Sequence, residues 1–171
     1  MAKFVPALAI STMLNLLGEY HCKVDPKGRM MFPARFRKQL EMVIHHGLVV
    51  NRDIFSKCLI LYPKPEWDKV NEEISRLSRY SEKHQRFQRK FLRGATTLEL
   101  DATGRLLIPS VLLDYAEVDL KKSNEVILTG IGEKMEIWSS ANYNVEVLDE
   151  DLDFGALAEE VRKDIEGKPA T

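Results

Sequence analysis

The sequence contains the segment Asp25-Pro26-Lys27-Gly28-Arg29-Met30-Met31-Phe32-Pro33, and a related segment follows as Asp101-Ala102-Thr103-Gly104-Arg105-Leu106-Leu107-Ile108-Pro109. Both copies follow the pattern Asp-x-x-Gly-Arg-x-x-x-Pro, and similarity at one fixed offset is the signature of an internally repeated chain. The same offset of 76 also pairs residues outside the motif: Gly18 with Gly94, Val24 with Leu100, Leu61 with Ile137 and Tyr62 with Trp138. A short motif recurring by chance would not carry its flanks with it, so the chain is predicted to hold two related modules.

Each motif is predicted to be a β-hairpin closed by a three-residue loop. Apolar residues alternate before the aspartate in both copies, which is the periodicity of a strand, and short apolar runs follow at 30–32 and 106–108. Aspartate caps backbone amides in turns and glycine accepts positive φ, so both belong where the chain reverses. Pro33 and Pro109 are expected to end the outgoing strands.

The rest of each module is predicted to be small strands and short helices. Strands are expected at 48–51, 58–62, 126–129 and 134–138, with a helix at 34–40. Two helices are expected between the modules, one entered through Pro65 and one capped by Ser81. Their aromatic residues Trp67, Phe87 and Phe91 are assigned to the core. The fold class is therefore mainly β with helices (α+β).

These elements divide the chain into five parts. The predicted boundaries are an N-terminal extension at 1–12, a first module at 18–64, a helical basic connector at 65–93, a second module at 94–143, and an acidic C-terminal helix and tail at 144–171. The last helix is expected to be amphipathic, because Leu157, Val161 and Ile165 recur at helical spacing.

The net charge of −1 conceals a division along the chain. Residues 1–93 hold 18 Lys and Arg against 9 Asp and Glu, whereas residues 94–171 hold 7 against 17. A basic surface attracts polyanions, so a nucleic-acid face is expected in the first half. The alternative is that the two halves attract each other across an interface.

Composition and motifs exclude several classes of function. No stretch approaches the roughly 20 continuous apolar residues of a membrane span. Cys22 and Cys58 are far apart and read as core residues of a cytoplasmic protein. Because no metal-ligand spacing, phosphate-binding glycine loop or nucleophile motif occurs, we expect no catalysis, no metal, no cofactor and no small-molecule substrate.

The hairpin arginine has two interpretations. Asp25 and Arg29 flank the turn, close enough for the carboxylate to orient the guanidinium. Such a pair could simply close the turn, although an exposed ion pair contributes only about 0–1 kcal/mol. Alternatively, a rigid hairpin presents the arginine to a phosphate or a guanine edge, which its planar fork can bind through two hydrogen bonds. Spacing alone leaves both open.

The charges around the first copy favour DNA binding there. Residues 18–46 hold six bases and three acids, but the equivalent residues 94–122 hold three and five. The first module is therefore expected to make most of the DNA contact. The predicted DNA-binding residues are Lys27, Arg29, Arg35, Arg37, Lys38 and Arg105, and the predicted turn residues that orient the arginines are Asp25, Gly28, Asp101 and Gly104.

A second basic tract, 76–93, has seven bases and the single acid Glu82. It is interpreted as a solvated helical face or as a surface that pairs with acids across an interface; a second polyanion surface is the other possibility.

With these residues in hand, the sequence resembles the MraZ family of bacterial transcriptional regulators, within the AbrB-like swapped-hairpin DNA-binding proteins. The residues that carry the resemblance are Gly18-Glu19-Tyr20, Asp25 to Arg29, Leu61-Tyr62-Pro63 with Trp67, Arg89 to Ala95, and Asp101 to Pro109.

The resemblance implies that each copy is half of an interleaved β-barrel, so that one chain forms an internal pseudo-dimer. It also implies a cytoplasmic, nucleoid-associated homo-oligomeric ring. This ring would bind repeated double-stranded DNA sites in the promoter of a cell-division and cell-wall gene cluster, its own promoter included. The DNA-contacting positions of AbrB-like relatives fall on Arg29, Arg37 and Lys38, whereas the second copy has Leu113 and Asp114 in place of the basic pair. An antitoxin-like protein whose acidic tail binds a partner is the alternative function.

Overall fold

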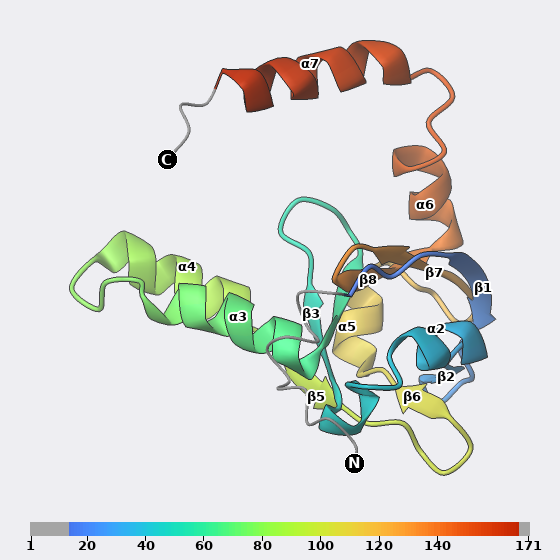
Figure 1. The fold of residues 1–171 in the computed structure, drawn as a ribbon. Coiled ribbons are helices and arrows are strands. Elements are labelled where there is room, and N and C mark those ends of the chain that lie inside the picture. Colours follow the sequence, from blue (N-terminus) through green and yellow to red (C-terminus); the bar gives the residue numbers. More distant parts are fainter. Residues whose placement is uncertain (1–13, 168–171) are drawn as a thin grey trace, which may run out of the picture.

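The computed structural model describes residues 14–167. The expected extension at 1–12 and the end of the tail, 168–171, lie outside this range. The described range contains eight strands and seven α-helical or 3-10 elements, and Figure 1 shows their arrangement. The strands are β1 (Glu19–Lys23), β2 (Arg29–Met31), β3 (Leu48–Arg52), β4 (Leu59–Pro63), β5 (Thr96–Leu98), β6 (Arg105–Leu107), β7 (Glu125–Ile131) and β8 (Lys134–Ser139). The helices are α2 (Ala34–Gln39), the 3-10 helix η1 (Ile44–His46), α3 (Lys64–Ser75), α4 (Glu82–Leu92), α5 (Ser110–Tyr115), α6 (Ser140–Glu146) and α7 (Phe154–Glu166).

The two modules are interleaved rather than side by side. Six strands form one antiparallel sheet in the order β1-β7-β8-β4-β3-β5, and β2 pairs with β6 in a separate ribbon. The first strand of each copy pairs with a strand of the other copy, β1 with β7 and β5 with β3. The two hairpins also exchange strands, because β2 belongs to the first copy and β6 to the second. The predicted α+β fold of swapped hairpins is confirmed.

An internal two-fold relation follows from the strand registers. Met30 faces Leu106 in the ribbon, and Ile60 faces Glu136 in the sheet. Each of these pairs joins two residues that are equivalent under the 76-residue offset. The internal two-fold axis therefore passes between the two partners of each pair. Since β2 and β6 run antiparallel, the two turns lie at opposite ends of the ribbon.

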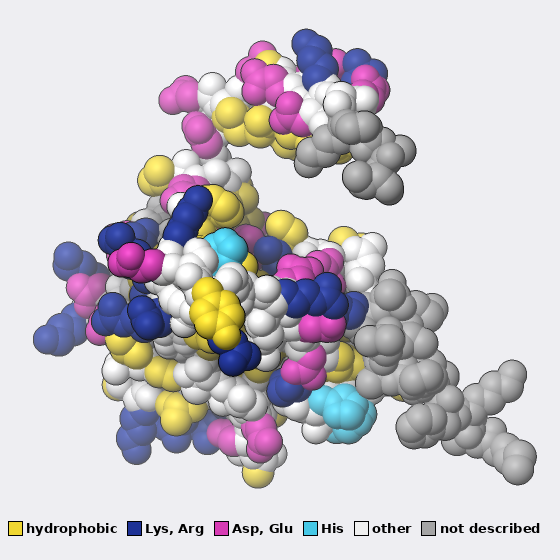
Figure 2. Space-filling view, turned by 90° about the vertical axis from the view of Figure 1, so that its left-hand side faces the viewer, with side chains coloured by type: hydrophobic (Ala, Val, Ile, Leu, Met, Phe, Trp, Pro, Cys, Tyr) yellow, Lys and Arg dark blue, Asp and Glu magenta, His cyan; other side chains and the backbone are white. Residues whose placement is uncertain are grey.

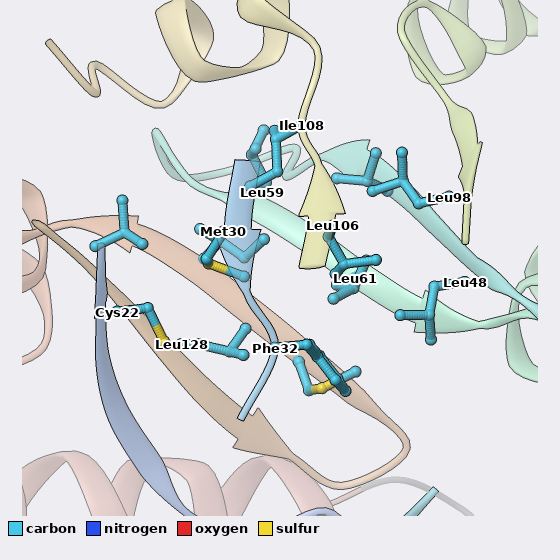
Figure 3. Packing of buried hydrophobic residues seen from close by; sticks show 14 of the residues in the cluster. Cys22, Met30, Phe32, Leu48, Leu59, Leu61, Leu98, Leu106, Ile108 and Leu128 are labelled. Atoms are coloured by element: carbon cyan, nitrogen blue, oxygen red, sulfur yellow. The ribbon is translucent and has the colours of Figure 1, made fainter. Parts of the chain in front are cut away.

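The hydrophobic core lies between the ribbon and the six-stranded sheet (Figure 3). Met30 and Leu106 point from the ribbon towards the sheet, where they meet Leu59 and Leu61, and all four are fully buried. Burying a side chain of this size contributes about 1.5–3 kcal/mol. The ribbon is thus held firmly, with its other face turned outwards.

Both cysteines lie in the core, as predicted. Cys22 and Cys58 are buried and form no disulfide. Burial raises the pKa of the Cys22 thiol to about 11 and raises the pKa of the Cys58 thiol as well. Both therefore stay protonated and act as small apolar residues.

The helical hairpin α3–α4 extends from the sheet (Figure 1). Trp67 is buried and its ring stacks on Phe91 at a centroid distance of 6.2 Å. The core assignment of Phe87 was wrong, because its side chain is 42% exposed. Only part of α4 rests on the body of the protein, and Phe87 lies on a helix face that no described residue covers fully.

Two side chains of β3 fix the end of α4. Asn51 donates from Nδ2 to the carbonyl of Phe91 at 2.9 Å, and Arg52 donates from Nη2 to the carbonyl of Lys90 at 2.8 Å. The last carbonyls of a helix have no partner within the helix, so these contacts satisfy them and anchor α4 to the sheet.

The C-terminal helix α7 forms as predicted but stands away from the body (Figure 1). Asp153 caps its first turn by accepting a hydrogen bond from the Ala156 amide. Every residue from Phe154 to Glu166 is exposed, including the apolar positions that formed the predicted stripe.

Every helix of the described residues is too short or too polar to span a lipid bilayer. Between residues 14 and 167, no three His, Cys, Asp or Glu side chains are grouped so that they could hold a metal ion.

Candidate nucleic-acid interface

The first turn holds its arginine in a fixed position. Oδ1 of Asp25 accepts hydrogen bonds from the amides of Lys27 and Arg29, both at 2.9 Å. Oδ2 of Asp25 accepts one from Nε of Arg29 at 2.6 Å. The amide of Gly28 closes the turn by donating to the Asp25 carbonyl, and Gly28 adopts a φ of 86°. The carboxylate therefore organises the loop and the guanidinium together.

The second turn repeats this geometry. Asp101 accepts from the amides of Thr103 and Arg105, both at 2.9 Å, and from Nε of Arg105 at 2.8 Å. Thr103 adds a hydroxyl donor to the same carboxylate. Gly104 has a φ of 83°, close to that of its counterpart in the first turn. The backbone and the arginine are thus arranged alike in both copies.

Hydrogen bonding lowers the pKa of both turn carboxyls. The backbone amide of Arg29 is the main cause at Asp25, and the backbone amide of Arg105 is the main cause at Asp101. Because both pKa values fall below the ordinary 3.8, these interactions stabilise the turns above that pH and are lost as the pH falls through the lower folded-state values. Each arginine is accordingly paired with an ionised carboxylate at neutral pH.

The outer face of the β2–β6 ribbon carries four side chains. Because Met30 and Leu106 point inwards, the residues on either side of them point outwards. These are Arg29, Met31, Arg105 and Leu107. Arg29 faces Leu107 across the ribbon, and Met31 faces Arg105, so each arginine lies beside an apolar residue of the other copy.

Met31 and Leu107 were missed in the sequence analysis. Their side chains are 54% and 56% exposed, although both stand in runs that read as apolar strands. The alternation within each run, with the buried Met30 and Leu106 next to them, is the signal that could have identified them.

The helix after the first hairpin lies beside the ribbon (Figure 1). Phe36 and Leu40 are buried beneath it, whereas the predicted residues Arg35, Arg37 and Lys38 are exposed on its surface. Gln39 fixes the helix by exchanging two hydrogen bonds with the backbone of Leu17, at 3.0 and 2.9 Å.

Strand exchange places Arg37 against the second turn rather than the first. A Cβ built on Gly104 would clash with Nη2 of Arg37. The equivalent residue of the second copy, Leu113, lies correspondingly over Gly28, with 3.7 Å between Cδ1 and a Cβ built there. The first turn therefore presents Lys27 and Arg29, and the second presents Arg105 with Arg37.

Four basic side chains of this surface form no ion pair within the described residues. Arg29 and Arg105 pair with their turn aspartates, but no ion pair among residues 14–167 includes Lys27, Arg35, Arg37 or Lys38. The surface thus combines two fixed arginines, four unpaired cations and two exposed apolar side chains on one ribbon and its adjoining helix.

Comparisons with known proteins give consistent results. The sequence profile of a family described as "MraZ protein, putative antitoxin-like" matches residues 15–90 and, a second time, residues 91–161. The chain is 40% identical over 149 residues to the transcriptional regulator MraZ of Christiangramia forsetii, which covers 87% of this chain and 94% of that protein. It is 41% identical over 149 residues to the protein of the same name from Flavobacterium psychrophilum, with 87% and 92% covered. The corresponding protein of a Marinomonas species is 37% identical over 129 residues, with 75% and 83% covered.

Proposed function

This chain belongs to the MraZ family, and we propose that it is a transcriptional regulator that binds double-stranded DNA through the outer face of the β2–β6 ribbon and helix α2. The names of its relatives support the regulatory role. The observation that carries the DNA-binding surface is the pair of turns, in which an ionised aspartate holds each arginine at one end of an exposed ribbon.

The ribbon has the right form for the major groove of DNA. That groove is about 12 Å wide and admits a two-stranded β-ribbon. Each turn aspartate contacts Nε of its arginine, which leaves the Nη groups as donors for a phosphate or for O6 and N7 of guanine. Lys27, Arg35, Arg37 and Lys38 would contact phosphates and set the position of the ribbon.

We further propose that the target is a set of repeated sites in the promoter of a cell-division and cell-wall gene cluster, including the protein's own promoter. The protein would act there as a homo-oligomeric ring associated with the nucleoid. An oligomer that engages several repeats gains avidity without any new contact, so modest binding by each chain would suffice.

Replacing Asp25 by alanine distinguishes two effects of its carboxylate, the orientation of Arg29 and the negative charge beside the DNA. The change removes a negative charge beside the DNA, which by itself favours binding, but it also removes the acceptor of three hydrogen bonds that fix the turn and Arg29. We expect affinity for the specific site to fall by about fivefold or more, because an arginine that is no longer held by the turn must be ordered when DNA binds.

Fluorescence anisotropy with a duplex from the chain's own upstream region measures this effect. Glu41→Ala is the matched control, because Glu41 is an exposed acid next to α2 that contacts neither turn arginine. If Asp25→Ala binds as well as Glu41→Ala, the aspartate does not position a DNA-binding group.

Met31→Ala and Leu107→Ala test the apolar part of the ribbon. Apolar side chains in the major groove contact the methyl group of thymine, so we expect each variant to lose affinity several-fold for the specific site. Binding to a scrambled duplex and the dependence on salt should not change, because no charge is removed. Equal losses on both duplexes would show that these residues do not contribute to specificity.

A further inference from the structure

The apolar face of α7 has no partner within the described residues. Phe154, Leu157, Val161 and Ile165 are 77%, 38%, 48% and 69% exposed. Figure 2 shows hydrophobic side chains along one side of this helix, with open space between them and the body of the protein. Acids border one side of the stripe, where Glu160 and Asp164 recur at helical spacing, and Asp149, Glu150, Asp151 and Asp153 precede the helix.

Helix α4 borders a groove whose lining has two cations and one acid. The groove has a volume of about 320 Å³ and lies between α4 and the loop after β3; it is lined by Arg52, Asp53, Ile54, Phe87, Lys90, Phe91 and Tyr115. The carboxylate of Asp53 accepts hydrogen bonds from the amides of Phe55 and Ser56. Beside it, Ile54 is 54% exposed and Phe55 is 91% exposed. These exposed apolar side chains are neighbours and form one patch. An exposed apolar patch of this kind is typical of an interaction surface.

The cations of α4 stand next to its exposed aromatics. At 100° per residue, Lys83 and Lys90 flank Phe87 on one side of the helix. Neither lysine, nor Arg86, Arg89 or Arg93, takes part in an ion pair among residues 14–167. Nε of Arg52 is buried at the groove without a hydrogen-bond acceptor in the described chain. The groove therefore suits an acidic helix that carries an apolar stripe.

One chain thus contains both halves of a complementary contact, and they do not meet. The side-chain ion pairs of α7 stay within the helix, where Arg162 contacts Glu159 and Glu166. No side chain of α7 lies in the lining of the groove. A second copy can fill the groove of the first with its own α7 and leave both folds unchanged.

We propose that α7 of one chain docks in the α4 groove of a second copy. The apolar stripe would cover Ile54, Phe87 and Phe91, and the acids beside it would face Lys83 and Lys90. Because two different surfaces meet, the contact is heterologous, and its repetition closes a ring or extends a filament. The inference specifies the contact behind the homo-oligomer proposed above, and it rests on that part of the proposed function.

Two charge-reversal variants test the contact, one altered in the helix and the other altered in the groove. The helix variant carries Glu160→Lys and Asp164→Lys, and the groove variant carries Lys83→Glu and Lys90→Glu. Light scattering after size exclusion should give an oligomer for the unmodified chain and a mass close to that of one chain for each variant. Circular dichroism and thermal unfolding of each variant, compared with the unmodified chain, verify that the fold is intact.

Mixing the variants gives the decisive outcome. In an equimolar mixture the intact α7 of the groove variant meets the intact groove of the helix variant, and the reversed α7 of the helix variant meets the reversed groove of the groove variant. The mixture should therefore recover assemblies that neither variant forms alone, and so should a chain with all four substitutions. Oligomers of unchanged size in both variants would overturn the proposal, as would a monomeric unmodified chain, in which α7 folds onto its own groove or binds a different protein.

DNA binding is measured in parallel with a single-site duplex. A monomeric chain that binds this duplex would overturn the contact and leave the DNA-binding function standing. If the chain assembles as described but binds no DNA, the proposed DNA-binding function is refuted and the contact between copies is supported.

Discussion

Replacing Arg29 by alanine lowers the affinity for the specific DNA site by about 5- to 150-fold, which corresponds to the roughly 1–3 kcal/mol of a bidentate contact with a base. Arg29 is the residue that the first turn holds most firmly, with its amide and its Nε both bonded to Asp25. That orientation is fixed before DNA arrives, so little side-chain entropy remains to be lost on binding. Fluorescence anisotropy with a duplex that contains one site measures the change.

Arg79→Ala is the matched control for Arg29→Ala. Arg79 is exposed beyond α3 and lies outside the ribbon and α2, so its removal lowers the net charge equally without touching the proposed interface. If Arg29 binds a phosphate rather than a base, its loss also reduces the salt dependence by roughly one unit. Equal affinities of the Arg29→Ala and Arg79→Ala variants would show that the first turn makes no DNA contact.

Replacing Gly28 by alanine destabilises the fold by about 2–4 kcal/mol. Gly28 has a φ of 86°, where an L side chain costs about 1–2 kcal/mol, and its new Cβ would lie 2.7 Å from the carbonyl oxygen of Ile108. That oxygen belongs to the backbone of the other module and cannot move alone. The turn also uses the Gly28 carbonyl, which accepts from the amide of Ile108 at 2.9 Å. Relieving the clash therefore disturbs the exchange of strands.

Gly104→Ala is the internal comparison. Its φ is 83°, so the conformational cost is the same, but its new Cβ would meet the guanidinium of Arg37, which can rotate away. We expect a loss of only about 1–2 kcal/mol here. Urea unfolding of both variants measures the difference, and a Gly104→Ala variant at least as unstable as Gly28→Ala would contradict the described packing.

The geometry of each turn could be predicted from the sequence because the residues that form the turn are neighbours in the chain. The turn depends on residues within five positions of one another, and the contact of Asp25 with Arg29 follows from the spacing of the motif. The repeated offset likewise predicted two related modules, and the alternation before each aspartate predicted strands. These features need no knowledge of which strands pair over long distances.

The grouping of the basic residues could not be predicted in this way. Arg37 follows Arg29 closely in sequence and was expected to act with it, yet the structure places it against Gly104 of the other copy. Only the pairing of β2 with β6 brings α2 to the second turn. Residues from both copies therefore form the basic surface together. A comparison of the charges in residues 18–46 with those in residues 94–122 assigns them to separate surfaces.

Amphipathic patterns also leave the partner of a helix undetermined. The spacing of Leu157, Val161 and Ile165 predicted α7 correctly, but a stripe identifies a face and not what covers it. Phe87 shows the same limit, since its helical spacing suggested the core and its side chain is partly exposed.

A footprint on the chain's own upstream region measures whether the ribbon with its two turn arginines binds specific DNA. We predict protection of repeated short sites by the unmodified chain, and loss of that protection by Arg29→Ala at concentrations where Arg79→Ala still protects. A footprint by Arg29→Ala that matches the unmodified chain would show that the first turn does not bind specific DNA, and a lack of protected sites with every variant would show the same of the whole ribbon.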